Sequence, residues 1–201
     1  MSNMLDKQFK LLLEREKRFA KNVVYLIRAE TQRPWWHIFI PFRFLFEYRG
    51  LKKDIRNFSA KHVHLKHIAL SAAYRSIASN DRDKNQQAMQ AELRDFYLHT
   101  QKLASQEAYE LLRQWMDLLF QHYFRLFQVP ERDYQKLIRQ AYASSGEYRS
   151  FLDQLSSLEQ GMDQAAQKAL EDGQGGPSFR NKQQAVQDLR ARELNDMYQI
   201  Y

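Results

Sequence analysis

Apolar side chains recur at helical spacing in the first part of the chain. Between residues 2 and 32 they follow alternating intervals of four and three, and Glu16 is the one polar interruption of the stripe Leu5, Phe9, Leu12, Phe19, Val23 and Leu26. These intervals place the stripe on one face of an amphipathic helix. Pro34 should end this helix, because the residue before a proline is pushed out of the helical region.

The same periodicity predicts further helices up to residue 128. Residues 51–79 carry apolar positions near one face, and SNDRD at 79–83 has the Asn and Asp residues of a turn. Residues 83–128 contain no Gly or Pro and keep helical spacing throughout. They form either one very long helix or two helices with a break near 100–107, and the rarity of helices above about 25 residues favours the break.

Turn and capping residues divide the rest of the chain. Pro130 in VPERDY suits the first position of a helix that should run to about Ala143. Ser144 and Glu147 have the spacing of a capping box for the next helix. GQGGPS at 173–178 is typical of a linker, after which Ser178 should cap a last amphipathic helix.

The predicted fold is all-α, an irregular, elongated multi-helix bundle of about six helices. We divide the chain into a helical domain over residues 1–172, a Gly-rich linker over 173–178 and a C-terminal amphipathic helix over 179–201. The basic N-terminal part of the domain covers residues 1–79. It includes an aromatic segment, residues 33–50, that is broken by Pro34 and Pro41 and lies between the first two long helices.

The aromatic segment, RPWWHIFIPFRFLFEYRG, contains two Trp, four Phe and one Tyr. Between residues 35 and 48 its only strongly polar side chains are His37, Arg43 and Glu47. Burial of one large apolar side chain is worth about 1.5–3 kcal/mol, so about ten of them represent well over 10 kcal/mol. Such a surface has to be covered, since an exposed patch of this size marks an interaction site or an aggregation hazard.

Three covers are open for the aromatic segment. The first is the protein's own core, with the segment packed between the first helix and those at 51–128. The second is a membrane interface, because an apolar run of about 10–14 residues is too short to span a bilayer but suits an interfacial element, where Trp is enriched. The third, stacking on nucleic-acid bases, is disfavoured because basic residues bracket the aromatic ones instead of alternating with them.

Basic residues gather in the first part of the chain. Residues 1–75 carry 16 Lys and Arg against 6 Asp and Glu, a net charge of +10, whereas residues 76–201 carry 15 against 18, a net charge of −3. This asymmetry favours an anionic partner such as phospholipid headgroups. On this hypothesis the side chains that insert into the interface are Trp35, Trp36, Phe39, Phe42, Phe44 and Phe46, and those that contact the anionic surface are Arg33, Arg43, Arg49, Lys52, Lys53 and Arg56.

Composition and motifs do not point to an enzyme. The chain has no Cys, which excludes disulfides, thiolate metal sites and thiol catalysis and fits a reducing compartment. His64 and His67 in HVHLKH lie near one helical face, but two ligands do not make a metal site, so they are weak metal candidates. Motifs for a di-iron bundle, a nucleophile elbow or a phosphate loop are missing from the sequence.

We therefore expect a non-enzymatic interaction or adaptor protein that associates peripherally with an anionic membrane surface through residues 33–56. Its amphipathic helices should bind a protein partner or a second copy of the chain. We expect a cytoplasmic location at the inner face of the membrane, no cofactor and no nucleic-acid partner. Two alternatives stay open: a soluble, self-associating helical protein whose aromatic segment is core, and a helical metal protein or enzyme that uses His64 and His67.

Overall fold

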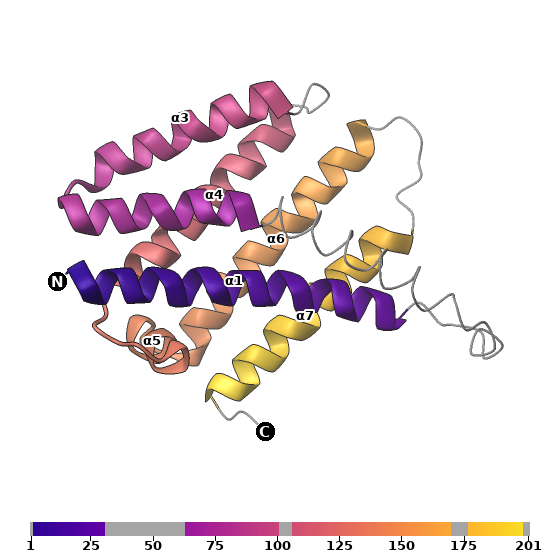
Figure 1. The fold of residues 1–201 in the computed structure, drawn as a ribbon. Coiled ribbons are helices and arrows are strands. Elements are labelled where there is room, and N and C mark those ends of the chain that lie inside the picture. The colour runs from indigo at the N-terminus through magenta and orange to yellow at the C-terminus, as the bar shows by residue number, and fades with distance from the viewer. Residues whose placement is uncertain (1, 31–62, 101–105, 170–176, 199–201) are drawn as a thin grey trace, which may run out of the picture.

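The computed structural model describes residues 2–30, 63–100, 106–169 and 177–198, which form helices joined by turns (Figure 1). No strand occurs in these ranges. The predicted all-α, multi-helix bundle is confirmed, with seven helical segments in the described residues where about six were expected. The segments are α1 (Ser2–Glu30), a helix over residues 63–79, α3 (Arg82–Thr100), α4 (Gln106–Phe127), α5 (Tyr134–Ala141), α6 (Ser145–Ala169) and α7 (Pro177–Tyr198).

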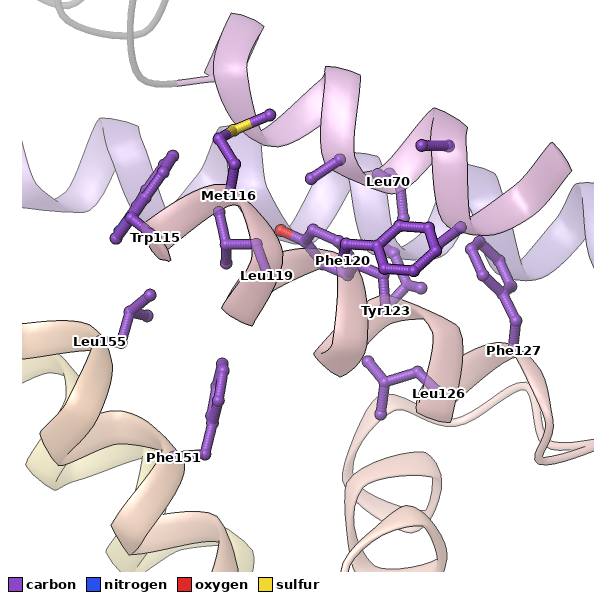
Figure 2. Close-up of a cluster of buried hydrophobic side chains, with 14 of the residues drawn as sticks. Leu70, Trp115, Met116, Leu119, Phe120, Tyr123, Leu126, Phe127, Phe151 and Leu155 are labelled. Carbon is purple, nitrogen blue, oxygen red and sulfur yellow. The ribbon is translucent and has the colours of Figure 1, made fainter. Parts of the chain in front are cut away.

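Helix α4 is the central element of the core. It packs on α3, α5 and α6, and it buries side chains on more than one of its sides. Figure 2 shows Phe151 and Leu155 of α6 approaching α4 on one side, while Leu70 of the 63–79 helix lies on another. The buried apolar and aromatic residues of α4 are Trp115, Met116, Leu119, Phe120, Tyr123, Leu126 and Phe127.

The 63–79 helix lies against α1 and runs antiparallel to it. Lys66 Nζ pairs with Glu16 Oε2 at 2.6 Å, and the Tyr74 hydroxyl donates to Asp6 Oδ1 at 2.5 Å. Because the residue numbers rise along one helix as they fall along the other, these two contacts define the antiparallel register. The two helices that flank the aromatic segment in sequence are therefore direct neighbours.

A tight turn separates the 63–79 helix from α3, as the sequence predicts. Asn80 has φ 53°, a left-handed conformation that Asn adopts more readily than most residues. Asp81 Oδ1 accepts the backbone N–H of Lys84 at 3.1 Å and so caps α3. Since Gln86 and Gln90 of α3 both donate to Asp117 of α4, residues 83–128 contain two helices that pack against each other, as the favoured interpretation predicts.

The predicted helix start at Pro130 is wrong, because α5 begins at Tyr134. Asp133 is the N-cap, and its Oδ1 accepts the backbone N–H of Lys136 at 3.0 Å. Glu131 Oε1 accepts the next two backbone N–H groups, which holds residues 131–133 in a turn. Acidic side chains that bind nearby N–H groups compete with the helix here and delay its start.

Ser144 and Glu147 cap α6 in a variant of the predicted capping box. Ser144 Oγ accepts the backbone N–H of Glu147 at 3.1 Å, as expected. The Glu147 carboxylate, however, accepts the N–H of Ala143 at 2.8 Å, one residue before the usual partner. It also pairs with Arg125 of α4, so the cap links the start of α6 to the central helix.

Helix α7 begins at Pro177, so Ser178 lies inside its first turn and not before it. Proline is favoured at a first helical position because its missing N–H would have no partner there. Helix α7 packs on α1 and α6. None of the helices in the described ranges is both long and apolar enough to cross a bilayer.

Candidate functional site

The twelve residues predicted to contact a membrane lie outside the described residues. The helices that lead into and out of this segment are α1, which ends at Glu30, and the helix over residues 63–79. Their geometry therefore bears on the candidate site. The twelve residues are Trp35, Trp36, Phe39, Phe42, Phe44 and Phe46, with Arg33, Arg43, Arg49, Lys52, Lys53 and Arg56.

Helix α1 presents a row of basic side chains to solvent. Nine of its side chains between residues 3 and 26 are exposed: five cations, one carboxylate, two Asn and one Tyr. Seven of the nine follow intervals of four and three, which align them along one side of the helix. We call the five cations and the Tyr the α1 basic face: Lys7, Lys10, Lys17, Arg18, Lys21 and Tyr25.

One acidic side chain interrupts the α1 basic face without neutralising it. Glu14 Oε1 pairs with Lys17 Nζ at 2.7 Å, and both side chains are at least half exposed. Five cations and one carboxylate leave a net charge of +4 on the nine exposed side chains. The field of the α1 basic face is therefore positive along its length.

Tyr25 lies at the end of the α1 basic face that leads toward the aromatic segment in sequence. It is the only large apolar side chain of the described residues that is exposed, at 45%. Lys21 Nζ lies 5.7 Å from its ring centroid, within the range of a cation–π contact. An exposed Tyr beside cations has the amphipathic character of side chains found at membrane–water interfaces.

Buried ionic contacts hold the opposite side of α1. Glu16 accepts from Lys66 Nζ at 2.6 Å and, through its other oxygen, from the Tyr123 hydroxyl at 2.8 Å. The Lys66 side chain is 6% exposed. Burial, followed by the neighbouring Glu16, raises the pKa of Tyr123 well above its usual value, so the hydroxyl stays protonated and donates. These contacts set the rotation of α1 and turn the basic face outward.

A second set of ionic contacts joins α1 and α6 to α7. Arg15 Nη2 of α1 lies 3.0 Å from Glu193 Oε1 of α7. Arg190 of α7, 5% exposed, donates to Glu159 of α6 at 2.9 Å and to Ser156 of α6 at 2.7 Å. Arg190 therefore crosses from α7 into the interior of the bundle.

A cavity of about 40 Å³ lies where these ionic contacts meet. It is large enough for water but far below the roughly 300–1,000 Å³ of ligand pockets. Burial raises the pKa of Tyr134 and Tyr148 on its wall well above the usual value, which keeps both hydroxyls neutral. The charged residues that line the cavity are Arg15, Glu16, Lys66, Arg190 and Glu193.

His122 faces the same cavity but is unsuited to acid–base chemistry near neutral pH. Its Nδ1 lies 2.7 Å from the Tyr142 hydroxyl, and its ring stacks on Phe151 at a centroid distance of 4.3 Å. Burial lowers the pKa of His122 to about 3, and the cations Lys66 and Arg125 add to this effect. A neutral imidazole with this pKa serves as a packed and hydrogen-bonded core side chain.

The weak metal candidates are on the surface of the 63–79 helix. His64 and His67 are both exposed, and the ring of His67 meets Phe9 of α1 edge-on at 5.8 Å. In the ranges that the structure covers, no group of three His, Cys, Asp or Glu residues is arranged to hold a metal ion. The two histidines therefore have no third ligand among the described residues.

The spacing of apolar residues predicts the apolar face of α1 but not the role of its charged residues. Glu16 interrupts the apolar stripe, and in the structure its carboxylate accepts hydrogen bonds from Lys66 and Tyr123. The usable signal was a carboxylate in the middle of an apolar stripe, since a buried charge needs a partner on a neighbouring helix. The partner itself could not be chosen from many Lys and Arg residues.

Comparisons with known proteins add no relationship to this geometry. No protein-family model, curated protein or solved structure matches the chain.

Proposed function

We propose that this protein is a non-enzymatic adaptor that associates peripherally with an anionic membrane surface. The observation that carries the proposal is the α1 basic face, five exposed cations against one carboxylate, with Tyr25 at its end. This row leads in sequence toward Trp35 and Trp36 and the basic residues that bracket the aromatic segment. Residues 33–56 insert into the interface, and the α1 basic face lies on the headgroups.

Electrostatic attraction and apolar insertion reinforce each other in this arrangement. A Lys or Arg near an anionic bilayer is worth about 1 kcal/mol, so the α1 basic face supplies several kcal/mol. The attraction falls off within a Debye length, about 8 Å at physiological salt, which requires the helix to lie along the surface. Insertion of the aromatic side chains adds apolar burial to this attraction, so binding depends on insertion as well as on charge.

Flotation of the purified protein with vesicles tests the proposal. We expect binding to phosphatidylcholine vesicles that contain phosphatidylserine, little binding to phosphatidylcholine alone, and weaker binding as salt rises. Replacement of Trp35 and Trp36 by Ala should reduce binding at every salt concentration, because the insertion it removes is not screened.

A pair of matched charge reversals locates the surface. Lys10, Lys17 and Lys21→Glu on α1 should weaken binding to anionic vesicles at least about tenfold. The control reverses three exposed cations of α3 and α6, Lys84, Arg94 and Arg149→Glu, and changes the net charge equally. Equal losses in both variants, or no flotation of the unaltered protein, would refute the proposal. If the protein binds an unrelated RNA but not anionic vesicles, the α1 basic face is a nucleic-acid surface.

A further inference from the structure

A pocket of about 390 Å³ lies between the C-terminal half of α4 and the N-terminal half of α6. Its volume falls within the roughly 300–1,000 Å³ of ligand sites, unlike that of the 40 Å³ cavity beside Glu16 and Lys66. The residues of the α1 basic face, all of which the structure describes, do not line it. The pocket is therefore a second candidate site, separate from the surface proposed to meet a membrane.

Antiparallel packing of α4 and α6 builds two walls of the pocket. Trp115 of α4 donates to Glu159 of α6, and Arg125 of α4 pairs with Glu147 of α6, so residue numbers rise along one helix as they fall along the other. Residues three or four positions apart share one face of a helix. The polar lining residues have this spacing on both helices: Gln121, Arg125 and Gln128 on α4, and Glu147, Ser150 and Gln154 on α6.

Buried aromatic rings form the floor of the pocket. His122, Tyr142 and Phe151 line it, and none of them is more than 8% exposed. The centroid of the His122 ring lies 4.3 Å from that of Phe151 and 5.9 Å from that of Tyr142. Burial lowers the pKa of His122 and raises the pKa of Tyr142, so both are uncharged near neutral pH. The floor is therefore closely packed and neutral, and a charged group of a ligand has to be bound at the rim.

Two guanidinium groups lie at the rim, each against an aromatic ring. Arg82, at the start of α3, lies 4.9 Å from the Phe124 centroid and donates to Gln121 Oε1 at 2.5 Å. The guanidinium of Arg125 lies 4.7 Å from the Tyr142 centroid. Both are cation–π distances, and such contacts hold the two side chains beside the pocket.

The two guanidinium groups lie over adjacent turns of α4. Gln121 and Arg125 are four residues apart, so their side chains are neighbours on one face of the helix. Because Arg82 is bonded to Gln121, its guanidinium lies about one turn from Arg125 along α4. A phosphate has enough oxygens to accept from two guanidinium groups at once, whereas a carboxylate matches the fork of one.

The described residues that line the pocket carry a net positive charge. Arg82 and Arg125 stand against one carboxylate, Glu147, which leaves a charge of +1. Glu147 is already engaged, since it accepts the N–H of Ala143 at 2.8 Å and pairs with Arg125. A guanidinium has five N–H donors, so an arginine that gives one of them to Gln121 or Glu147 can still bind an anion. The Arg125 side chain is 43% exposed and Arg82 is exposed, so an anion in solution can reach both.

We propose that this pocket binds a small phosphate monoester with a flat, apolar body. The phosphate lies between Arg82 and Arg125, and the apolar body lies over the aromatic floor against the half-buried side chains of Leu118 and Phe124. The Ser150 hydroxyl, on the opposite wall, is placed to bond to the ligand. This inference goes beyond the proposed function and does not depend on it.

Calorimetric titration of the full chain with phenyl phosphate tests the pocket. Inorganic phosphate supplies the anion without the ring, and phenol supplies the ring without the anion. We expect saturable binding of phenyl phosphate, at least about tenfold tighter than that of either, because only phenyl phosphate makes both the charged hydrogen bonds and the apolar contact.

A matched pair of charge substitutions locates the phosphate. Arg82→Gln should weaken the binding of phenyl phosphate at least about fivefold, because it removes one of the two guanidinium groups. Lys84→Gln removes an exposed cation two residues away with the same change in net charge, and it should weaken binding less than about twofold.

A second pair of substitutions fills the pocket without a change in charge. Ser150→Phe places a ring in the space between the walls and should abolish saturable binding. Ser157→Phe, also at an exposed position of α6 but two turns beyond the pocket, should bind phenyl phosphate as the unaltered protein does. Both positions are exposed, so both variants should keep the fold, and thermal unfolding checks this.

Three results would overturn the inference: no saturable binding of phenyl phosphate, equal affinity for inorganic phosphate, or equal losses in Arg82→Gln and Lys84→Gln. Each of them leaves the proposed function in place, because that function is tested by flotation with vesicles. Conversely, a protein that does not float but binds phenyl phosphate in the pattern described retains the pocket and loses the membrane surface.

Discussion

Adjacent charged residues in α1 have opposite environments. Arg15 and Glu16 turn inward to Glu193 and Lys66, whereas Lys17 and Arg18 are exposed. A rotation of 100° per residue accounts for this change within one turn of helix. A buried charge is stable only with a partner, and a solvated charge is free to meet an external one. The same residue type therefore has a structural role at one position and a candidate binding role at the next.

His122 should make the free energy of unfolding depend on pH in a predictable direction. Its folded pKa of about 3 lies below the unfolded value of 6.5, so the unfolded chain takes up the proton first. The stabilisation is complete above pH 6.5 and is lost as the pH falls from 6.5 toward 3. The loss amounts to at most about 1.4 kcal/mol per pH unit.

Urea unfolding of the unaltered protein and of His122→Gln at pH 7 and pH 5 measures this contribution. Gln can still bond to the Tyr142 hydroxyl but does not titrate. Between pH 7 and pH 5 we expect the unaltered protein to lose about 2 kcal/mol more than the variant. Glu131 and Glu147 contribute little in this window, because hydrogen bonds from backbone N–H groups lower the pKa of both carboxylates. Equal losses in both proteins would contradict the assignment.

At the scale of elements, hydrophobic periodicity predicts which segments are helical but not where each helix begins and ends. The stripe over residues 2–32 predicted α1, and the structure ends that helix at Glu30. The start of α5 was predicted four residues too early, since Pro130 suits a first position but side-chain hydrogen bonds to backbone N–H groups decided the outcome. Such competition between caps depends on local geometry that spacing alone does not contain.

The cap of α5 can be measured with two substitutions at one position. Asp133→Ala should lower the free energy of unfolding by about 1 kcal/mol, because the N–H of Lys136 loses its acceptor. Asp133→Asn keeps a side-chain oxygen at the cap and should cost less than about 0.5 kcal/mol. Chemical denaturation of both variants gives the comparison, and an equally large loss in Asp133→Asn would show that charge, not capping, is the relevant property.

At the scale of the whole molecule, the ionic contacts join helices that are distant in sequence. Glu16 meets Lys66 and Tyr123, and Arg190 meets Glu159. The sequence predicted the all-α class and the apolar stripe of α1, in which Leu12 and Val23 are buried. It could not predict these pairs, because any of several carboxylates could face any of many cations until the helices are packed. The α1 basic face was hidden for the same reason, since exposure follows from which side of α1 is covered.

The Glu16–Lys66 pair joins α1 to the 63–79 helix, so its removal should destabilise the whole fold. Glu16→Ala leaves the Lys66 ammonium, 6% exposed, without its carboxylate and the Tyr123 hydroxyl without an acceptor. We expect the free energy of unfolding to fall by about 3 kcal/mol. Glu14→Ala breaks an exposed pair with Lys17 on the same helix and should cost less than about 1 kcal/mol.

Replacement of both buried charges, Glu16→Leu with Lys66→Met, should restore part of the loss, because no unpaired charge remains inside. Urea unfolding of the four proteins distinguishes a buried clamp from a surface contact, and a Glu16→Ala loss no larger than that of Glu14→Ala would mean that α1 is held by its apolar face alone.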